Sequence, residues 1–195
     1  MKKTNLKNFI ILGVLALLIV GAFVLVANRG SEKQETPIEM TAVEEVISRN
    51  LEKDYPATPK EVVKMYSEIT RCFYAEEYTE DELIKMAEQS RKLFDEDLRA
   101  NQTDEQYLMN LNSVILNYKE QKRIISSFSV SSASDVDYYD FKGDKWARLM
   151  AVYTIKTDHV FDSSKEEYLL RKDASGHWRI FGWRVMNEED EGNEG

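Results

Sequence analysis

The stretch that decides the fold runs from Trp146 to Val185 and holds three apolar segments, WARLMAVYTIKT (146–157), KEEYLLRKD (165–173) and HWRIFGWRV (177–185). Each alternates with a period of two residues, which predicts a β-strand. Between the last two segments lies the turn Asp173-Ala-Ser-Gly176, in which the glycine can take a positive φ without a Cβ clash. The sequence therefore predicts a meander of antiparallel strands.

An earlier strand is predicted where Ile124, Phe128 and Val130 alternate with serines, and we expect it to continue irregularly to Tyr139. In the first long strand one alternating set is almost wholly apolar, so it should face the core. That set is Ala147, Leu149, Ala151, Tyr153 and Ile155. In the last strand, Trp178 and Ile180 share the inward face, which leaves Phe181 and Trp183 on the outward face.

Three helices are predicted before the strands, because three capping boxes follow one another. In each box a threonine precedes a glutamate or glutamine by three residues, and an apolar periodic run follows. The pairs are Thr58 with Glu61, Thr79 with Glu82, and Thr103 with Gln106. The sequence therefore predicts an α+β domain over residues 58–186, with helices packed on a curved antiparallel sheet.

The run from Phe9 to Ala27 is uncharged and 19 residues long, which as a helix matches the thickness of a bilayer. Its apolar side chains favour insertion by about 6 kcal/mol in sum. Lys2, Lys3 and Lys7 precede it, so residues 1–8 should stay in the cytoplasm and the body should face outward. A cleaved signal peptide fits less well, because Leu25 occupies the position before the cleavage site where a small residue is expected.

The chain between the anchor and the domain, residues 28–57, reads as a polar tether followed by a helix from Pro37 to Leu51. Whether this helix is a stalk or packs on the domain stays open at this point. The tail 187–195 is acidic and poor in apolar residues, which predicts disorder. The formal net charge of the chain is -9, and no cluster of Lys and Arg is present, so nucleic acid is not an expected partner.

Three helices followed by a meander that ends in Tyr168-Leu-Leu-Arg-Lys-Asp-Ala-Ser-Gly-His-Trp178-Arg-Ile180 resemble the nuclear-transport-factor-two-like superfold of ketosteroid isomerases and SnoaL-like cyclases. The resemblance covers Thr58 to Val185. With the anchor included, the chain resembles uncharacterised single-pass membrane proteins of Gram-positive anaerobes. The resemblance implies a cone in which the sheet wraps the helices. Some members hold a ligand in the cone, and others only dimerise or bind proteins, so the fold leaves the function open.

No set of residues in the sequence predicts catalysis, a cofactor or a metal. His159 and His177 are expected in solvated turns, and Cys72 is expected to be a buried, inert thiol that has no partner for an internal disulfide. Four aspartates crowd one turn region but do not match the spacing of a calcium loop. They are Asp135, Asp137, Asp140 and Asp144.

Two functions remain, and the first is favoured. It is an extracytoplasmic module at the cell membrane that associates with itself or with an envelope protein through the outer sheet face. Its contact residues would be Trp146, Met150, Val152, Phe181 and Trp183, unless the helix from Pro37 covers them. The alternative is binding or catalysis inside the cone by Tyr66, Tyr118, Tyr153 and Arg184. A charged group pointing into the interior would favour this alternative.

Overall fold

The computed structural model describes residues 40–187. Within that range no helix is both long and apolar enough to cross a bilayer. The expected anchor Phe9–Ala27 and the polar tether lie outside the described residues, as do the acidic residues after Asn187.

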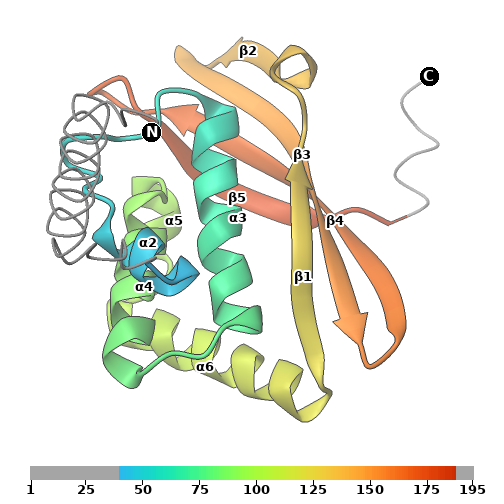
Figure 1. Cartoon of the computed structure of the whole chain (residues 1–195). Helices are drawn as coiled ribbons and strands as arrows, with labels where there is room; N and C mark the ends of the chain where they lie inside the picture. Colours follow the sequence, from blue (N-terminus) through green and yellow to red (C-terminus); the bar gives the residue numbers. More distant parts are fainter. Residues whose placement is uncertain (1–39, 188–195) are drawn as a thin grey trace, which may run out of the picture. The chain divides into compact units, whose positions relative to one another are not determined.

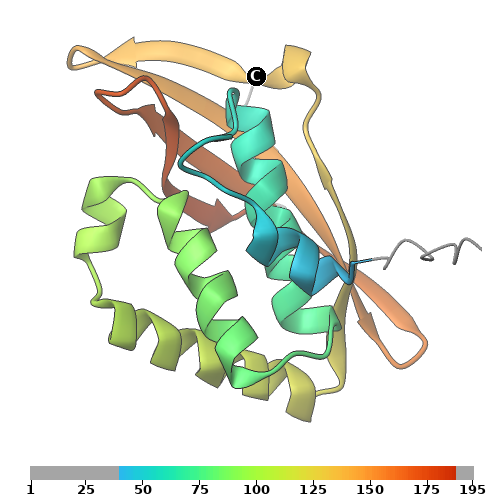
Figure 2. The same ribbon diagram turned by 60° about the vertical axis from the view of Figure 1, so that its left-hand side comes forward.

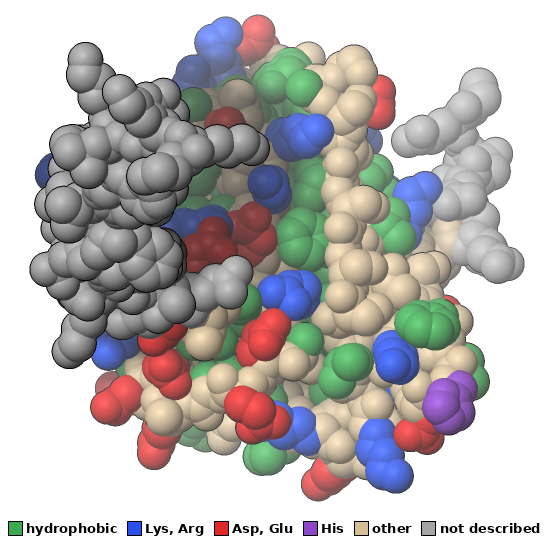
Figure 3. All heavy atoms as spheres, in the orientation of Figure 1, with side chains coloured by type: hydrophobic (Ala, Val, Ile, Leu, Met, Phe, Trp, Pro, Cys, Tyr) green, Lys and Arg blue, Asp and Glu red, His purple; other side chains and the backbone are tan. Residues whose placement is uncertain are grey.

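The three predicted helices are present with their predicted starts. They are α3 (Pro59–Ala75), α4 (Glu80–Lys92) and α6 (Asp104–Glu120). In each, the threonine hydroxyl accepts the backbone N–H three residues on, and the side chain at that position accepts the N–H of the threonine. These reciprocal hydrogen bonds satisfy amides that a helix start otherwise leaves free. In Figure 3 acidic side chains gather at the lower left, over α4 and α6, whose first turns are both acidic.

A short helix, α2 (Ala42–Ser48), precedes them with Thr41 as its N-cap, while Pro37, where the helix was predicted to begin, lies outside the described residues. It packs on α3 and α4 and buries Val43 and Val46 in the common core. The Gln89 side chain of α4 donates to two backbone carbonyls at the end of α2. This helix is therefore neither a stalk nor a cover for the outer sheet face, and the folded unit begins before residue 58.

All five strands pair antiparallel in one sheet. They are β1 (Arg123–Val130), β2 (Asp137–Phe141), β3 (Asp144–Thr157), β4 (Val160–Lys172) and β5 (Trp178–Val185). The order is β1-β3-β4-β5, and β2 pairs with the first part of β3. The expected continuation of β1 to Tyr139 is wrong, because a 3-10 turn at Ala133–Asp135 interrupts the chain and β2 is a separate strand.

The helices gather against one face of this sheet, with α3 running across it (Figures 1 and 2). We call this the inner face. The alternating set of β3 points there as predicted, and each of its five side chains is at most 5% exposed. Trp178 and Ile180 of β5 are buried on the same face. The outer face is the opposite one.

A β-bulge in β5 changes which side chains reach the inner face. Leu170 pairs with Ile180, but Leu169 pairs with Gly182, so Phe181 is an extra residue without a partner. The alternation therefore shifts by one position after Ile180. Trp183 pairs with the buried Tyr168 and points inward, whereas Arg184 points outward. The prediction that Trp183 lies on the outer face is wrong for this reason, and so is the prediction that Arg184 faces the interior.

The free edge of β5 is partly covered by the chain that follows α4. The Ile180 N–H donates to the Leu93 carbonyl at 2.9 Å, and the Asp95 N–H donates to the Ile180 carbonyl at 2.8 Å. Asp95 then caps a short helix, α5 (Glu96–Ala100), which the sequence patterns did not predict.

Candidate functional site

Two of the four residues predicted to face the interior, Tyr66 and Tyr153, meet at Tyr168 on the inner side, whereas Tyr118 packs elsewhere on the helices. Tyr66 of α3 is 8% exposed and contacts the Tyr168 ring edge-on at 5.9 Å. Tyr153 of β3 is buried, and Tyr118 of α6 packs against Tyr74 at 4.4 Å. Arg184 pairs with Glu167 at 2.8 Å on the outer face.

A chain of hydrogen bonds crosses the inner face. The Ser67 and Tyr153 hydroxyls lie 2.8 Å apart, and the Tyr153 and Tyr168 hydroxyls also lie 2.8 Å apart. The Tyr168 hydroxyl then donates to the Glu166 carboxylate at 2.6 Å. Helix α3 thereby connects through two strands to a carboxylate that shares the inner face with Tyr168, two residues away on β4.

Burial governs the protonation of this chain. It raises the pKa of Glu166, and the hydrogen bond from Tyr168 offsets only part of that rise. It raises the pKa of Tyr153 to about 12 and that of Tyr168 well above its ordinary value, so both phenols stay protonated near neutral pH. The hydroxyls can therefore pass hydrogen bonds along the chain, and Glu166 is its one carboxyl group.

Aromatic rings gather around Trp183, next to Tyr168 of this chain. Trp183 lies 5.4 Å from Tyr66, 6.0 Å from Tyr168 and 5.9 Å from Phe94, measured between ring centroids. Unlike the other three, the Trp183 side chain is substantially exposed, at 40%. We define the inner site as Tyr66, Glu166, Tyr168 and Trp183.

Of these four residues, sequence reasoning predicted only Tyr66 as part of an interior site. Glu166 could have been found by extending the inward alternation of β4 back from Leu170 and Tyr168. Trp183 was placed on the wrong face because the bulge was not anticipated. Gly182 was the available signal, since a glycine inside a strand often marks a bulge.

The outer face differs from the predicted interface. Trp146 is only 8% exposed, because Phe181 packs on it at 5.0 Å and the Arg171 guanidinium covers it at 5.7 Å. Met150 and Val152 are half-buried and stand opposite Glu167 and Lys165 of β4. The centre of this face is therefore a mixture of apolar and charged groups, without Trp183.

The outer face instead has a groove of about 530 Å³ beside β2, lined by aromatic and apolar side chains together with Asp97, Lys142, Asp144 and Arg171. We call it the outer groove and define it by Tyr139, Phe141, Trp146, Leu169 and Phe181. Phe141 is 54% exposed and Tyr139 is 38% exposed. Two of the five predicted interface residues, Trp146 and Phe181, line this groove.

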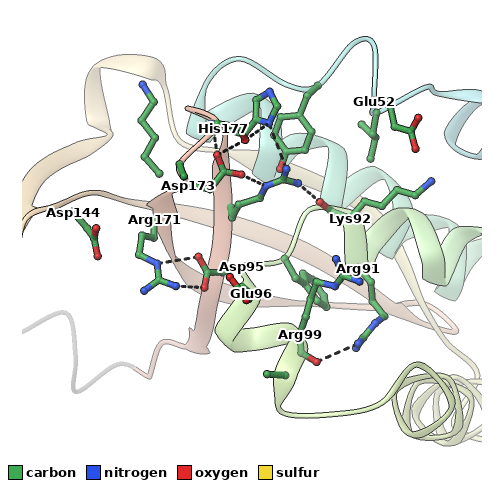
Figure 4. A pocket seen from close by; sticks show the side chains of 18 of the residues that line it. Glu52, Arg91, Lys92, Asp95, Glu96, Arg99, Asp144, Arg171, Asp173 and His177 are labelled. Atoms are coloured by element: carbon green, nitrogen blue, oxygen red, sulfur yellow. Dashed lines mark hydrogen bonds and ion pairs between the residues drawn. The ribbon is translucent and has the colours of Figure 1, made fainter.

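A larger hollow of about 1220 Å³ lies between α4, α5 and the β4–β5 turn. Figure 4 shows Arg171 turned toward Asp95. The Arg179 guanidinium donates to Asp173 at 2.8 Å. Asp95 is 2% exposed and accepts two hydrogen bonds from Arg171. Burial alone would raise the pKa of Asp173, but hydrogen bonds from Arg179, Ser175 and the His177 N–H outweigh it and lower the pKa to about 2. These pairs hold the turn against the helices, which is a structural role.

The remaining candidates show no reactive arrangement. Cys72 is 1% exposed, and burial raises its pKa to about 11, which disfavours the thiolate. The His177 ring packs at a tilt against Tyr55, 4.4 Å between centroids, and His159 is exposed in the two-residue turn between β3 and β4. Among residues 40–187 no three His, Cys, Asp or Glu side chains are arranged to hold a metal ion.

Comparison with curated proteins finds no match to this sequence. One family model matches residues 1–183, which is nearly the whole chain. Its description is a domain of unknown function (DUF6715), so the match assigns no activity to the inner site. The chain belongs to the DUF6715 family.

Proposed function

We propose that this protein binds a small molecule at the inner site and is held at the outer surface of the cell membrane by its N-terminal segment. The observation that carries the proposal is Glu166, a half-buried carboxylate on the inner face beside an exposed indole. Burying a carboxylate without a neighbouring cation costs free energy. An interior that served packing alone would not need a carboxylate at this position.

The resemblance to the nuclear-transport-factor-two-like cone supports the same site, because members of that superfold hold ligands between the helices and the inner sheet face. The charge step across Phe9 to Ala27 supports the tether and an extracytoplasmic body. Protease added to intact cells after wall removal should digest the body and spare the N-terminus. Protection of the body, or its release as a processed form, would contradict this topology.

The ligand proposal is tested with the full-length chain in a non-ionic detergent, labelled with 5-fluorotryptophan. Its three tryptophans give three fluorine signals, and Trp183→Phe assigns the exposed one. A mixed set of anionic, neutral and cationic small molecules is then titrated. We expect at least one to move the Trp183 signal saturably while the signals of the buried Trp146 and Trp178 stay in place. If no molecule of any charge does so, the proposal is wrong.

Association through the outer face is a second candidate, favoured by the outer groove. Exposed aromatic side chains around a groove are typical of protein contacts. Phe141→Glu should abolish self-association in light scattering if the groove joins two copies, whereas Val160→Glu, at the exposed turn between β3 and β4, should leave it unchanged. A chain that is monomeric at all concentrations would contradict association with itself.

A further inference from the structure

The charge surroundings of the inner site point to the kind of ligand. Glu166 accepts a hydrogen bond from Tyr168, but within residues 40–187 no Lys or Arg nitrogen lies within 4 Å of its carboxylate. Its neighbour Glu167, on the outer face, contacts both Arg148 and Arg184. Glu166 is thus a half-buried carboxylate whose countercharge the described chain does not supply.

The aromatic surroundings favour the same sign of charge. The face of an aromatic ring is negative and attracts cations, most strongly in tryptophan. Trp183 pairs with Tyr168 across the β4–β5 ladder, while Glu166 pairs with Val185, so Trp183 and Glu166 are diagonal neighbours on one face. The exposed indole and the carboxylate therefore project from the same face of the sheet, and both favour a positive charge.

At two other sites where an aromatic ring and a carboxylate lie together, the protein supplies an arginine of its own. The Arg179 guanidinium lies 4.3 Å from the centre of the Tyr55 ring and pairs with Asp173. Arg171 lies 5.2 Å from the Phe181 ring and pairs with Asp95. Each site combines an aromatic face, a carboxylate and an arginine. Among the described residues, the inner site has the first two components and lacks the third.

We infer that the ligand of the inner site is an organic cation, whose positive group lies between the Glu166 carboxylate and the face of the Trp183 indole. This inference rests on the proposed ligand-binding function and adds the charge of the ligand to it. The Tyr66 ring packs against the indole at 5.4 Å between centroids, and the Tyr168 hydroxyl fixes the orientation of the carboxylate.

The test compares choline with its neutral carbon analogue, 3,3-dimethyl-1-butanol, in ligand-observed NMR titrations of the full-length chain. The two probes share shape and hydroxyl and differ in charge. We expect choline to bind about 10-fold more tightly. A lysine amide with a blocked amino terminus, included as a third probe, shows whether a primary ammonium with a hydrated head binds as well as a methylated one.

Three variants assign the preference to the site. Glu166→Gln keeps the shape of the side chain and should remove most of the preference for choline. Glu167→Gln, one residue along and on the opposite face, is the matched control and should leave the preference unchanged. Trp183→Leu retains apolar contact and should weaken choline binding much more than binding of the neutral analogue.

The outcomes separate the two proposals. Equal affinity for the two probes in the unmodified chain, or an unchanged preference in Glu166→Gln, overturns the cation inference while ligand binding itself stands. If neither these probes nor the mixed set of the fluorine experiment binds, both proposals fall. Near-ultraviolet circular dichroism of each variant confirms that its tertiary packing is retained before the affinities are compared.

Discussion

Glu166 and Glu167 are adjacent on β4, yet the sheet gives them opposite surroundings. Glu167 faces outward and pairs with Arg184 at 2.8 Å and with Arg148 at 3.8 Å. Glu166 faces inward, where its carboxylate accepts a hydrogen bond from the Tyr168 hydroxyl, and the Tyr168 ring stacks on Trp183. The outer face is thus internally neutralised, whereas the inner face keeps a carboxylate available. This difference is the reason to look for a ligand on the inner face.

The largest expected effect tests whether the inner face holds the core. Trp178 is 7% exposed, so Trp178→Ala should lower the free energy of unfolding by about 3–5 kcal/mol. Phe181→Ala, three residues along on the outer face and half-exposed, should cost clearly less. Urea denaturation followed by near-ultraviolet circular dichroism measures both. Equal losses would mean that the two faces contribute alike to stability.

The next largest effect concerns Asp173, whose carboxylate pairs with the Arg179 guanidinium. Because the pKa of Asp173 is lowered to about 2 in the folded protein, its contribution to stability is present above its unfolded pKa and is lost as pH falls from about 4 to about 2. Allowing for solvent screening, we expect a loss of about 1–2 kcal/mol across that range. Asp173→Asn should flatten this part of the profile of unfolding free energy against pH. An unchanged profile would show that Arg179 does not stabilise the charge.

The contribution of Glu166 to stability should change with pH in the opposite direction. Because burial raises its pKa, the folded state binds a proton more tightly than the unfolded chain does, and stability falls as pH rises through the window above the ordinary pKa of glutamate. Glu166→Gln should therefore become stabilising relative to the unmodified chain as pH rises from 4 to 7, by less than the Asp173 effect. A variant that is less stable at pH 7 than at pH 4, relative to the unmodified chain, would contradict the assignment.

The smallest effect is expected for the outer ion pair. Arg184→Gln removes one contact of Glu167, but the Arg184 side chain is 58% exposed and Arg148 remains as a partner. The loss should be about 0.5 kcal/mol or less, and smaller still at high salt. Denaturation midpoints at two ionic strengths measure it. A loss above 1 kcal/mol would show that the outer face is more than a solvated surface.

The helix starts and the main strands could be predicted because their signals are local. A threonine cap acts on the next three residues, and strand alternation needs only neighbours. The short helix α5 and the separate strand β2 could not be predicted in the same way. Helix α5 spans five residues, so it has no periodic run of its own, and its cap residue Asp95 is fixed by contacts with β4 and β5.

The site was harder to predict than the fold because a single inserted residue decides it. With Phe181 as an extra residue, every side chain after Phe181 changes face, and the predicted roles of Trp183 and Arg184 are exchanged. Tyr66 and Tyr153 lie upstream of the bulge and were placed on the inner face as expected. Prediction therefore succeeded on β3 and failed on the second half of β5.

The backbone bridge between Phe94 and Ile180 has a consequence for the order in which the chain folds. Its two partners are separated by α5, α6 and the first four strands, so closing it costs more chain entropy than closing either neighbouring hairpin. We therefore expect β4 and β5 to pair before Leu93 and Asp95 reach them. During that interval the outer edge of β5 is an open template for another chain, and refolding at high protein concentration should give aggregates that pair through this strand. Hydrogen exchange during refolding should accordingly protect the Ile180 amide later than the amides of β3.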